Sequence, residues 1–107
     1  MTDRSDEGLA RDLSRQLTIL EKLLARCGER GWADAMIRCR QKVESSSEGH
    51  LSDAGRLILT MFVGMGSLND VVLHRDGRAL KAENDRLGRQ KEWLWQLAKA
   101  AIVGSAP

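Results

Sequence analysis

A glycine-rich stretch carries the residue types that could form a polar site. It contains, in order, Gly64, Gly66, Ser67, Asn69 and Asp70, and is followed by apolar residues. Glycine lets a backbone approach a ligand closely, and free amides at a helix start bind anions. The lysine and the longer glycine spacing of a phosphate-binding loop are missing, however.

A structural interpretation of the same stretch needs no ligand. Gly64 or Gly66 can adopt a positive φ that ends one helix. Ser67 can then cap a short new helix, and Asp70 can reach back towards its start. The apolar residues Leu68, Val71 and Val72 are expected to be buried. Because caps explain every residue type here, the structural interpretation is favoured, with direct contact to a partner or ligand as the alternative.

Asn84 is a polar residue on an apolar helical stripe, between Leu80 and Leu87. A buried amide must be hydrogen-bonded. Our hypothesis is that Asn84 contacts the turn at residues 67–70 and fixes the register of the two segments.

Metal and nucleophile chemistry find little support. Cys27 and Cys39 lie twelve residues apart and His50 and His74 twenty-four, so the close spacing of a zinc site is absent. Both cysteines lie on or near apolar stripes, which favours buried thiols over reactive ones. The acidic residues near the C-terminus alternate with Arg and Lys, which is typical of a solvated helix face. We expect no cofactor, no metal and no catalytic site.

Trp93 and Trp95 are the candidates for partner contact. Residues two apart on a helix diverge by about 200°, so both rings cannot face the core. An exposed tryptophan is favoured at interfaces. The acidic residues Asp6 and Glu7 of the N-terminal turn are further candidates for binding a partner.

Four helices are needed to position these residues. Apolar residues that recur every three or four positions predict helices over about 5–27, 31–45, 53–63 and 77–103. Ser5 and Ser52 are the expected N-caps, and Gly28 is the expected C-terminal cap. Short connections favour a compact antiparallel all-α bundle, with a short helix after the glycine-rich turn. We expect a single helical domain over 1–107, frayed at 1–5 and 104–107.

Composition limits the class of protein further. The 107 residues are 42% hydrophobic and carry a net charge of +2, without the basic stripe of a nucleic-acid binder. No apolar run approaches the ~20 residues of a membrane helix, and the N-terminus lacks the apolar core of a signal peptide. We therefore expect a cytoplasmic protein that binds neither nucleic acid nor membrane.

Two segments carry a family resemblance. They are Gly28-Glu29-Arg30-Gly31-Trp32-Ala33 and Phe62-Val63-Gly64-Met65-Gly66-Ser67-Leu68-Asn69-Asp70-Val71-Val72-Leu73. Together they resemble a family of small bacterial helical proteins of unknown function, marked by a Gly-Met-Gly-Ser-Leu-Asn-Asp motif. Val63 stands where members usually have a glycine. The resemblance covers most of residues 9–98 and implies no particular chemistry.

By size and class the chain is also similar to immunity proteins, which protect a bacterium from a toxin by binding it. We expect a protein-binding inhibitor that occludes the active site or substrate groove of a cognate toxin. The alternative is a non-catalytic regulatory or structural subunit that acts as a homodimer.

Overall fold

Four helices make up most of the protein. The computed structural model describes residues 4–46 and 51–104. The helices are α1 (Arg4–Arg26), α2 (Arg30–Ser45), α3 (Leu51–Thr60) and α4 (Lys81–Gly104). Between α3 and α4 lie a short 3-10 helix, η1 (Leu68–Asp70), and a hairpin of two strands, β1 (His74–Arg75) and β2 (Arg78–Ala79). The predicted all-α bundle with a short helix after the glycine-rich turn is confirmed.

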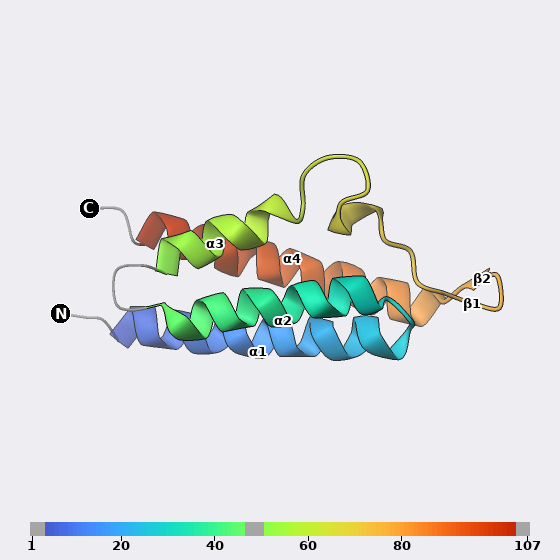
Figure 1. Cartoon of the computed structure of the whole chain (residues 1–107), viewed down its shortest axis with the longest axis horizontal. Coiled ribbons are helices and arrows are strands. Elements are labelled where there is room, and N and C mark those ends of the chain that lie inside the picture. Colours follow the sequence, from blue (N-terminus) through green and yellow to red (C-terminus); the bar gives the residue numbers. More distant parts are fainter. Residues whose placement is uncertain (1–3, 47–50, 105–107) are drawn as a thin grey trace.

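The helices alternate in direction along an elongated body of 51 × 23 × 20 Å (Figure 1). α1 packs against α2 and α4, and α3 packs mainly on α4. Since α3 is short, residues 61–80 continue past its end and run along α4 towards the hairpin.

Leucine stripes explain this packing. Leu13, Leu17, Leu20 and Leu24 recur on one face of α1 and are fully buried. They meet Met36 of α2 and the leucines of α4 in one apolar core. Burial of each such side chain contributes about 1.5–3 kcal/mol.

The ends of the helices differ from the predicted ones. α1 begins at Arg4 and α3 at Leu51, so Ser5 and Ser52 lie inside the helices that they were predicted to cap. Of the predicted frayed ends, residues 1–3 and 105–107 lie outside the described residues, whereas Arg4, Ser5 and Gly104 are helical.

The prediction that the last helix begins near Gly77 is wrong, because α4 begins at Lys81. Residues 74–79 form an antiparallel hairpin instead, with His74 opposite Ala79 and Arg75 opposite Arg78. Asp76 and Gly77 both have positive φ, at 54° and 77°. An Asp-Gly pair suits the two-residue hairpin turn that needs this conformation, and it therefore prevents an earlier helix start.

Candidate functional site

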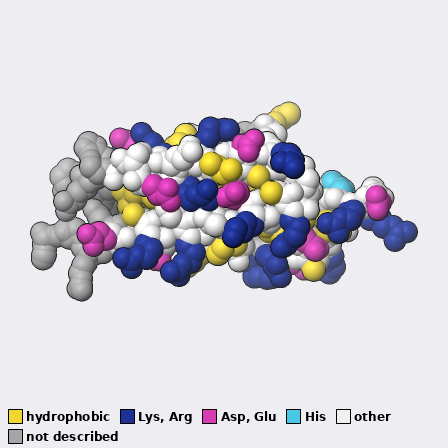
Figure 2. All heavy atoms as spheres, turned by 60° about the horizontal axis from the view of Figure 1, so that its bottom comes forward, with side chains coloured by type: hydrophobic (Ala, Val, Ile, Leu, Met, Phe, Trp, Pro, Cys, Tyr) yellow, Lys and Arg dark blue, Asp and Glu magenta, His cyan; other side chains and the backbone are white. Residues whose placement is uncertain are grey.

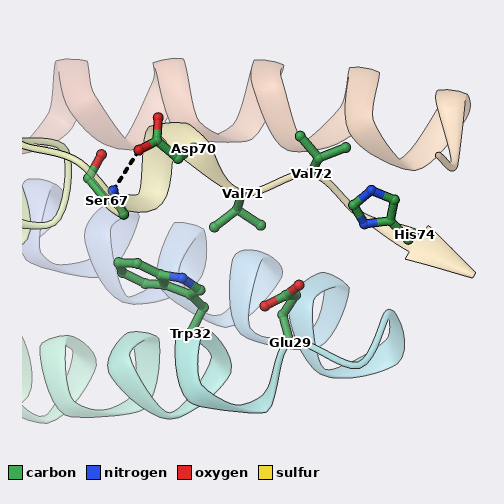
Figure 3. Close-up of a pocket in the computed structure, with 8 residues that line it drawn as sticks. Glu29, Trp32, Ser67, Asp70, Val71, Val72 and His74 are labelled. Atoms are coloured by element: carbon green, nitrogen blue, oxygen red, sulfur yellow. Dashed lines mark hydrogen bonds between the residues drawn. The ribbon is translucent and has the colours of Figure 1, made fainter. Parts of the chain in front are cut away.

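An open groove of about 460 Å³ lies between the start of α2 and the segment that leads from the glycine-rich turn into β1. Figure 3 shows that α2 contributes one wall and residues 66–74 the other. The lining residues are Glu29, Trp32, Gly66, Ser67, Asp70, Val71, Val72 and His74. Apolar side chains, two carboxylates and an imidazole thus meet in one place.

The turn between α1 and α2 positions Glu29 and Trp32. Gly28 has a φ of +86°, the amide of Glu29 donates to the carbonyl of Leu24 at 2.8 Å, and the amide of Gly28 donates to the carbonyl of Ala25. This is the paired hydrogen-bond pattern of a glycine-terminated helix. The predicted cap at Gly28 is therefore confirmed, and it directs the start of α2 towards the groove.

Hydrogen bonds within the glycine-rich turn order the opposite wall. Gly64 and Gly66 both have positive φ, at 90° and 72°. The hydroxyl of Ser67 accepts from the amide of Asn69, as expected of a cap on η1. Asp70 reaches back one residue further than a capping box requires and accepts from the amide of Gly66 at 2.6 Å.

Two hydrogen bonds, each between residues seven positions apart, close the loop that this turn forms. The side-chain amide of Asn69 donates to the carbonyl of Phe62 at 2.9 Å, and the amide of Leu68 donates to the carbonyl of Met61 at 2.7 Å. The favoured structural interpretation of Gly64, Gly66, Ser67, Asn69 and Asp70 is therefore supported. Gly66, Ser67 and Asp70 line the groove as well, so a structural role does not exclude a role in binding.

Asn84 ties α4 to the extended chain, although not at the predicted residues. Its Oδ1 accepts from the amide of Leu73 at 2.8 Å, and its Nδ2 donates to the carbonyls of Leu73 and Leu80. The predicted contact with residues 67–70 is wrong because those residues contact α4 about two turns further along, at Lys91. There the ammonium of Lys91 donates to the carbonyl of Leu68 at 3.3 Å.

Lys91 is a contact that the sequence analysis missed. Burial lowers the pKa of Lys91, and the negative charge of Asp70 partly opposes that shift. Its place on the apolar stripe of α4 was a usable signal, because a lysine there must direct its ammonium to an acceptor.

The apolar residues after η1 are only partly buried as predicted. Leu68 is buried and Val71 is half-buried, but Val72 is 46% exposed and Leu73 takes the core position. The reason is that the chain is extended here, so successive side chains point to opposite sides.

The predicted partner-binding residues lie outside the groove. Trp93 is 54% exposed on α4. Trp95 is half-buried and packs edge-to-face on Phe62, with ring centroids 5.3 Å apart. One ring is therefore exposed, as the helical geometry predicted. Glu7 is exposed on α1, and the side chain of Asp6 lies outside the described part.

The two cysteines are free, and they differ in exposure. Cys39 is buried, and burial raises its pKa to about 11, against the opposing charge of Arg38. A thiol with this pKa stays protonated at neutral pH and is a poor nucleophile. His74 lies in the exposed strand β1, whereas His50 falls outside the described residues. No group of three metal-ligating side chains occurs within residues 4–46 and 51–104.

Three of the lining residues were not predicted to belong to a site: Glu29, Trp32 and His74. Glu29 and Trp32 belong to the first of the two segments that carry the family resemblance, and the groove forms where this segment meets the second. The pairing of the two segments was thus the available signal. His74 could have been found from the Asp-Gly pair that follows it and turns the hairpin.

The fold and the groove define a small helical bundle with an open groove of mixed apolar and acidic lining. The chain belongs to the family described as Domain of unknown function (DUF6966), whose model matches residues 25–81. No curated protein and no solved structure matches the chain. The matched region contains every residue that lines the groove, together with α2, α3 and the hairpin.

Proposed function

We propose that this chain is a protein-binding inhibitor: a bacterial immunity protein that neutralises a cognate toxin in the cytoplasm. The observation that carries the proposal is the open groove, in which Trp32, Val71 and Val72 lie beside the carboxylates of Glu29 and Asp70. Apolar surface with a few polar groups is typical of a binding site. Occlusion of the toxin's active site or substrate groove would be the mechanism.

Exposed apolar side chains beside the groove support a protein partner. Met65 is 98% exposed and Val63 is 70% exposed, both on the loop that the bonds of Asn69 and Leu68 close. The exposed apolar side chains of this ordered loop contribute no hydrophobic stabilisation while they face water. A partner that covered them would gain the free energy of their burial. This loop and the residues that form one wall of the groove make up one continuous stretch of chain from residue 61 to residue 74.

The polar residues of the turn fit a binding role better than a catalytic one. The Ser67 hydroxyl accepts from the amide of Asn69, and the Asp70 carboxylate accepts from the amide of Gly66. Both side chains therefore hold the shape of the turn. A nucleophile would need a positioned base within hydrogen-bond reach, and in the described structure neither side chain is hydrogen-bonded to a basic side chain.

Colony counts test the proposal directly. The open reading frame beside this gene is expressed in a host with and without the chain, and we expect the neighbour to kill and the chain to restore growth. Met65→Asp should abolish the rescue without loss of thermal stability, because that side chain is almost wholly exposed.

Val103→Asp is the matched control, since Val103 is also an exposed apolar residue but lies at the end of α4. It should rescue like the wild type. A harmless neighbour, or a lethal one that the chain does not counteract, contradicts the immunity role.

A homodimeric regulatory or structural subunit is the second candidate, and the exposed ring of Trp93 favours it. Gln16 of α1 donates to the carbonyl of Gln90 of α4 at 3.0 Å. Ile19 and Trp93 each follow one of these glutamines by three residues, so two exposed apolar side chains flank the same seam. Light scattering should then give twice the 11.9 kDa chain mass, and Trp93→Ser should restore the monomer.

A further inference from the structure

The extended chain before β1 has one bonded side and one open side. On the bonded side, the amide and the carbonyl of Leu73 pair with Asn84, and that carbonyl also accepts from the amide of Leu80 at 2.9 Å. Neighbouring residues of an extended chain direct their backbone groups to opposite sides. The amide and carbonyl of Val72 therefore point away from α4, and within the described chain they have no hydrogen-bond partner.

His74 continues the same open edge. The register of the hairpin places Leu73 opposite Leu80. The amide of Leu80 donates to the carbonyl of Leu73, so the two residues form a hydrogen-bonded pair. The next pair, His74 and Ala79, is then a non-hydrogen-bonded pair, whose backbone groups point outwards. Val72 and His74 thus present a short strand edge, and both residues line the groove.

The facing wall of the groove carries an unpaired acidic group. Glu29 is half-buried at the start of α2, and its carboxylate makes no ion pair and no cap hydrogen bond in the described structure. Asp70 adds a second carboxylate, whose charge the ammonium of Lys91 partly offsets, and the lining residues include no lysine or arginine. Lys and Arg lie among Asp and Glu over the face that Figure 2 shows, whereas the groove lining holds carboxylates without Lys or Arg, so the groove favours a cationic side chain.

The shape of the groove suits a strand. In Figure 3 the side chain of Val71 points from the extended chain towards α2, and the ring of Trp32 lies to one side of Glu29, opposite Ser67. Its volume of about 460 Å³ lies within the range of roughly 300–1,000 Å³ that is common for binding pockets. Free backbone groups at an edge supply affinity to any extended peptide, and flanking side chains supply selectivity.

We propose that the groove binds an extended segment of the partner protein as an added β-strand, paired to Val72 and His74, with a Lys or Arg of that segment reaching Glu29. The inference deepens the proposed function and rests on it for the identity of the partner as a protein. Recognition would then depend on backbone hydrogen bonds to Val72 and His74 and on the negative charge of Glu29 on the facing wall. The loop of Val63 and Met65 directly precedes Gly66, the first of the residues 66–74 that line the groove.

A selection of random linear peptides on the full-length chain tests the proposal first. We expect selected sequences to place a Lys or Arg among apolar residues. In hydrogen exchange of the complex with a selected peptide, the amides of Val72 and His74 should exchange more slowly than in the free chain. Failure to select any peptide, or unchanged exchange at both amides, overturns the strand pairing.

Substitution of Val72 separates backbone from side chain. Val72→Pro removes an amide hydrogen that has no partner in the described chain, and Val71 already has the extended conformation (φ −72°, ψ 127°) that precedes proline. We expect the melting temperature to be retained and the peptide to bind about tenfold more weakly. Val72→Ala, which keeps the amide, should bind far better than the proline variant. Equal binding by the two variants contradicts the proposal.

Peptides methylated on alternate backbone nitrogens supply a measurement that leaves the chain unchanged. Methylation in one register should abolish binding to the wild-type protein and methylation in the other should not, because only alternate amides pair with an edge. If methylation in neither register weakens binding, the inference is overturned. This outcome is informative even if the Val72→Pro protein fails to fold.

Charge recognition is tested at Glu29. Glu29→Gln should weaken the binding of a basic peptide about tenfold, whereas Asp34→Asn, an exposed acid of the same helix that lies outside the groove, should have no effect. Equal effects of both variants would show attraction by net charge alone and would contradict a specific contact.

The rescue assay distinguishes this inference from the proposed function. Rescue by the wild type and not by Val72→Pro supports both. Rescue by both chains retains the immunity role and rejects the groove as its site, whereas loss of rescue by the wild type rejects the immunity role and leaves peptide binding to stand alone. A homodimer that Val72→Pro dissociates would show that a second copy covers the edge, which also rejects the proposal.

Discussion

Asn84 acts in place of a neighbouring strand. Its amide group satisfies both backbone groups of Leu73 and also the carbonyl of Leu80, so one side chain holds the base of the hairpin on α4. The wall of the groove depends on this contact because Val72 and His74 flank Leu73. A polar residue on an apolar stripe is thus explained by the backbone that it pairs with.

We expect Asn84→Ala to lower the free energy of unfolding by about 2 kcal/mol, since it leaves the amide of Leu73 without a partner. Gln96→Ala is the control, because among the described residues the side chain of Gln96 bonds only Glu92, on the exposed face of the same helix. Urea denaturation measures both variants. Equal stability of Asn84→Ala and wild type would show that the contact contributes nothing.

Cys39 makes stability depend on pH in the alkaline range. Its pKa is raised to about 11 in the folded chain from 9.0, so both states hold the proton below pH 9. Between pH 9 and 11 the unfolded chain loses the proton first, and the free energy of unfolding falls by about 3 kcal/mol. Lys91, whose pKa is lowered, acts in the opposite direction.

The difference between wild type and Cys39→Ala isolates the contribution of this thiol. The wild type should lose more stability between pH 9 and 11 than the variant does, as followed by chemical denaturation at each pH. Parallel curves would mean that the folded thiol ionises as readily as the unfolded one. Below pH 9 the gap between the two proteins should be constant.

At the scale of elements, the sequence predicts the helices well and the connections poorly. The leucine stripe of α1 and the glycine cap at Gly28 act within one helix, so their spacing alone reveals them. The hairpin depends on Asp76 and Gly77 adopting positive φ, a two-residue signal inside what reads as a helical pattern. The groove requires residues more than thirty positions apart to meet, which local spacing does not encode.

The contact between α3 and α4 depends on Gly55. A Cβ at this position would lie 2.8 Å from the carbonyl oxygen of Ala98 and 3.2 Å from the Cβ of Ala101. Gly55→Ala must therefore push the helices apart, and we expect a loss of about 1–3 kcal/mol. Because α3 precedes the loop of Val63 and Met65, the shift should also weaken partner binding.

Gly88→Ala is the matched substitution in the interior of α4, where a Cβ meets nothing within 4 Å. It should raise stability by about 0.5–1 kcal/mol through helix propensity alone. Thermal unfolding of both variants distinguishes the two cases. A Gly55→Ala protein as stable as Gly88→Ala would mean that α3 and α4 do not pack this closely.

At the scale of the molecule, the family match and the folding unit have different extents. The match covers residues 25–81, which include the groove. The core leucines of α1 and those of α4, however, lie outside it, and they bury the apolar faces of α2 and α3. The matched region therefore carries the groove, whereas the flanking helices supply much of the apolar burial that stabilises it.

A fragment of residues 25–81 should accordingly fail to fold alone. A chain of about 60 residues buries only about 60% of its unfolded surface even when its core is complete, and this fragment lacks Leu13, Leu17, Leu20 and Leu94. We expect a circular dichroism signal of low helicity with no cooperative melting, beside a sharp transition for the full chain. A cooperative transition in the fragment would show that the groove needs neither α1 nor α4, and the contacts of Asn84 and Lys91 would then lose their structural importance.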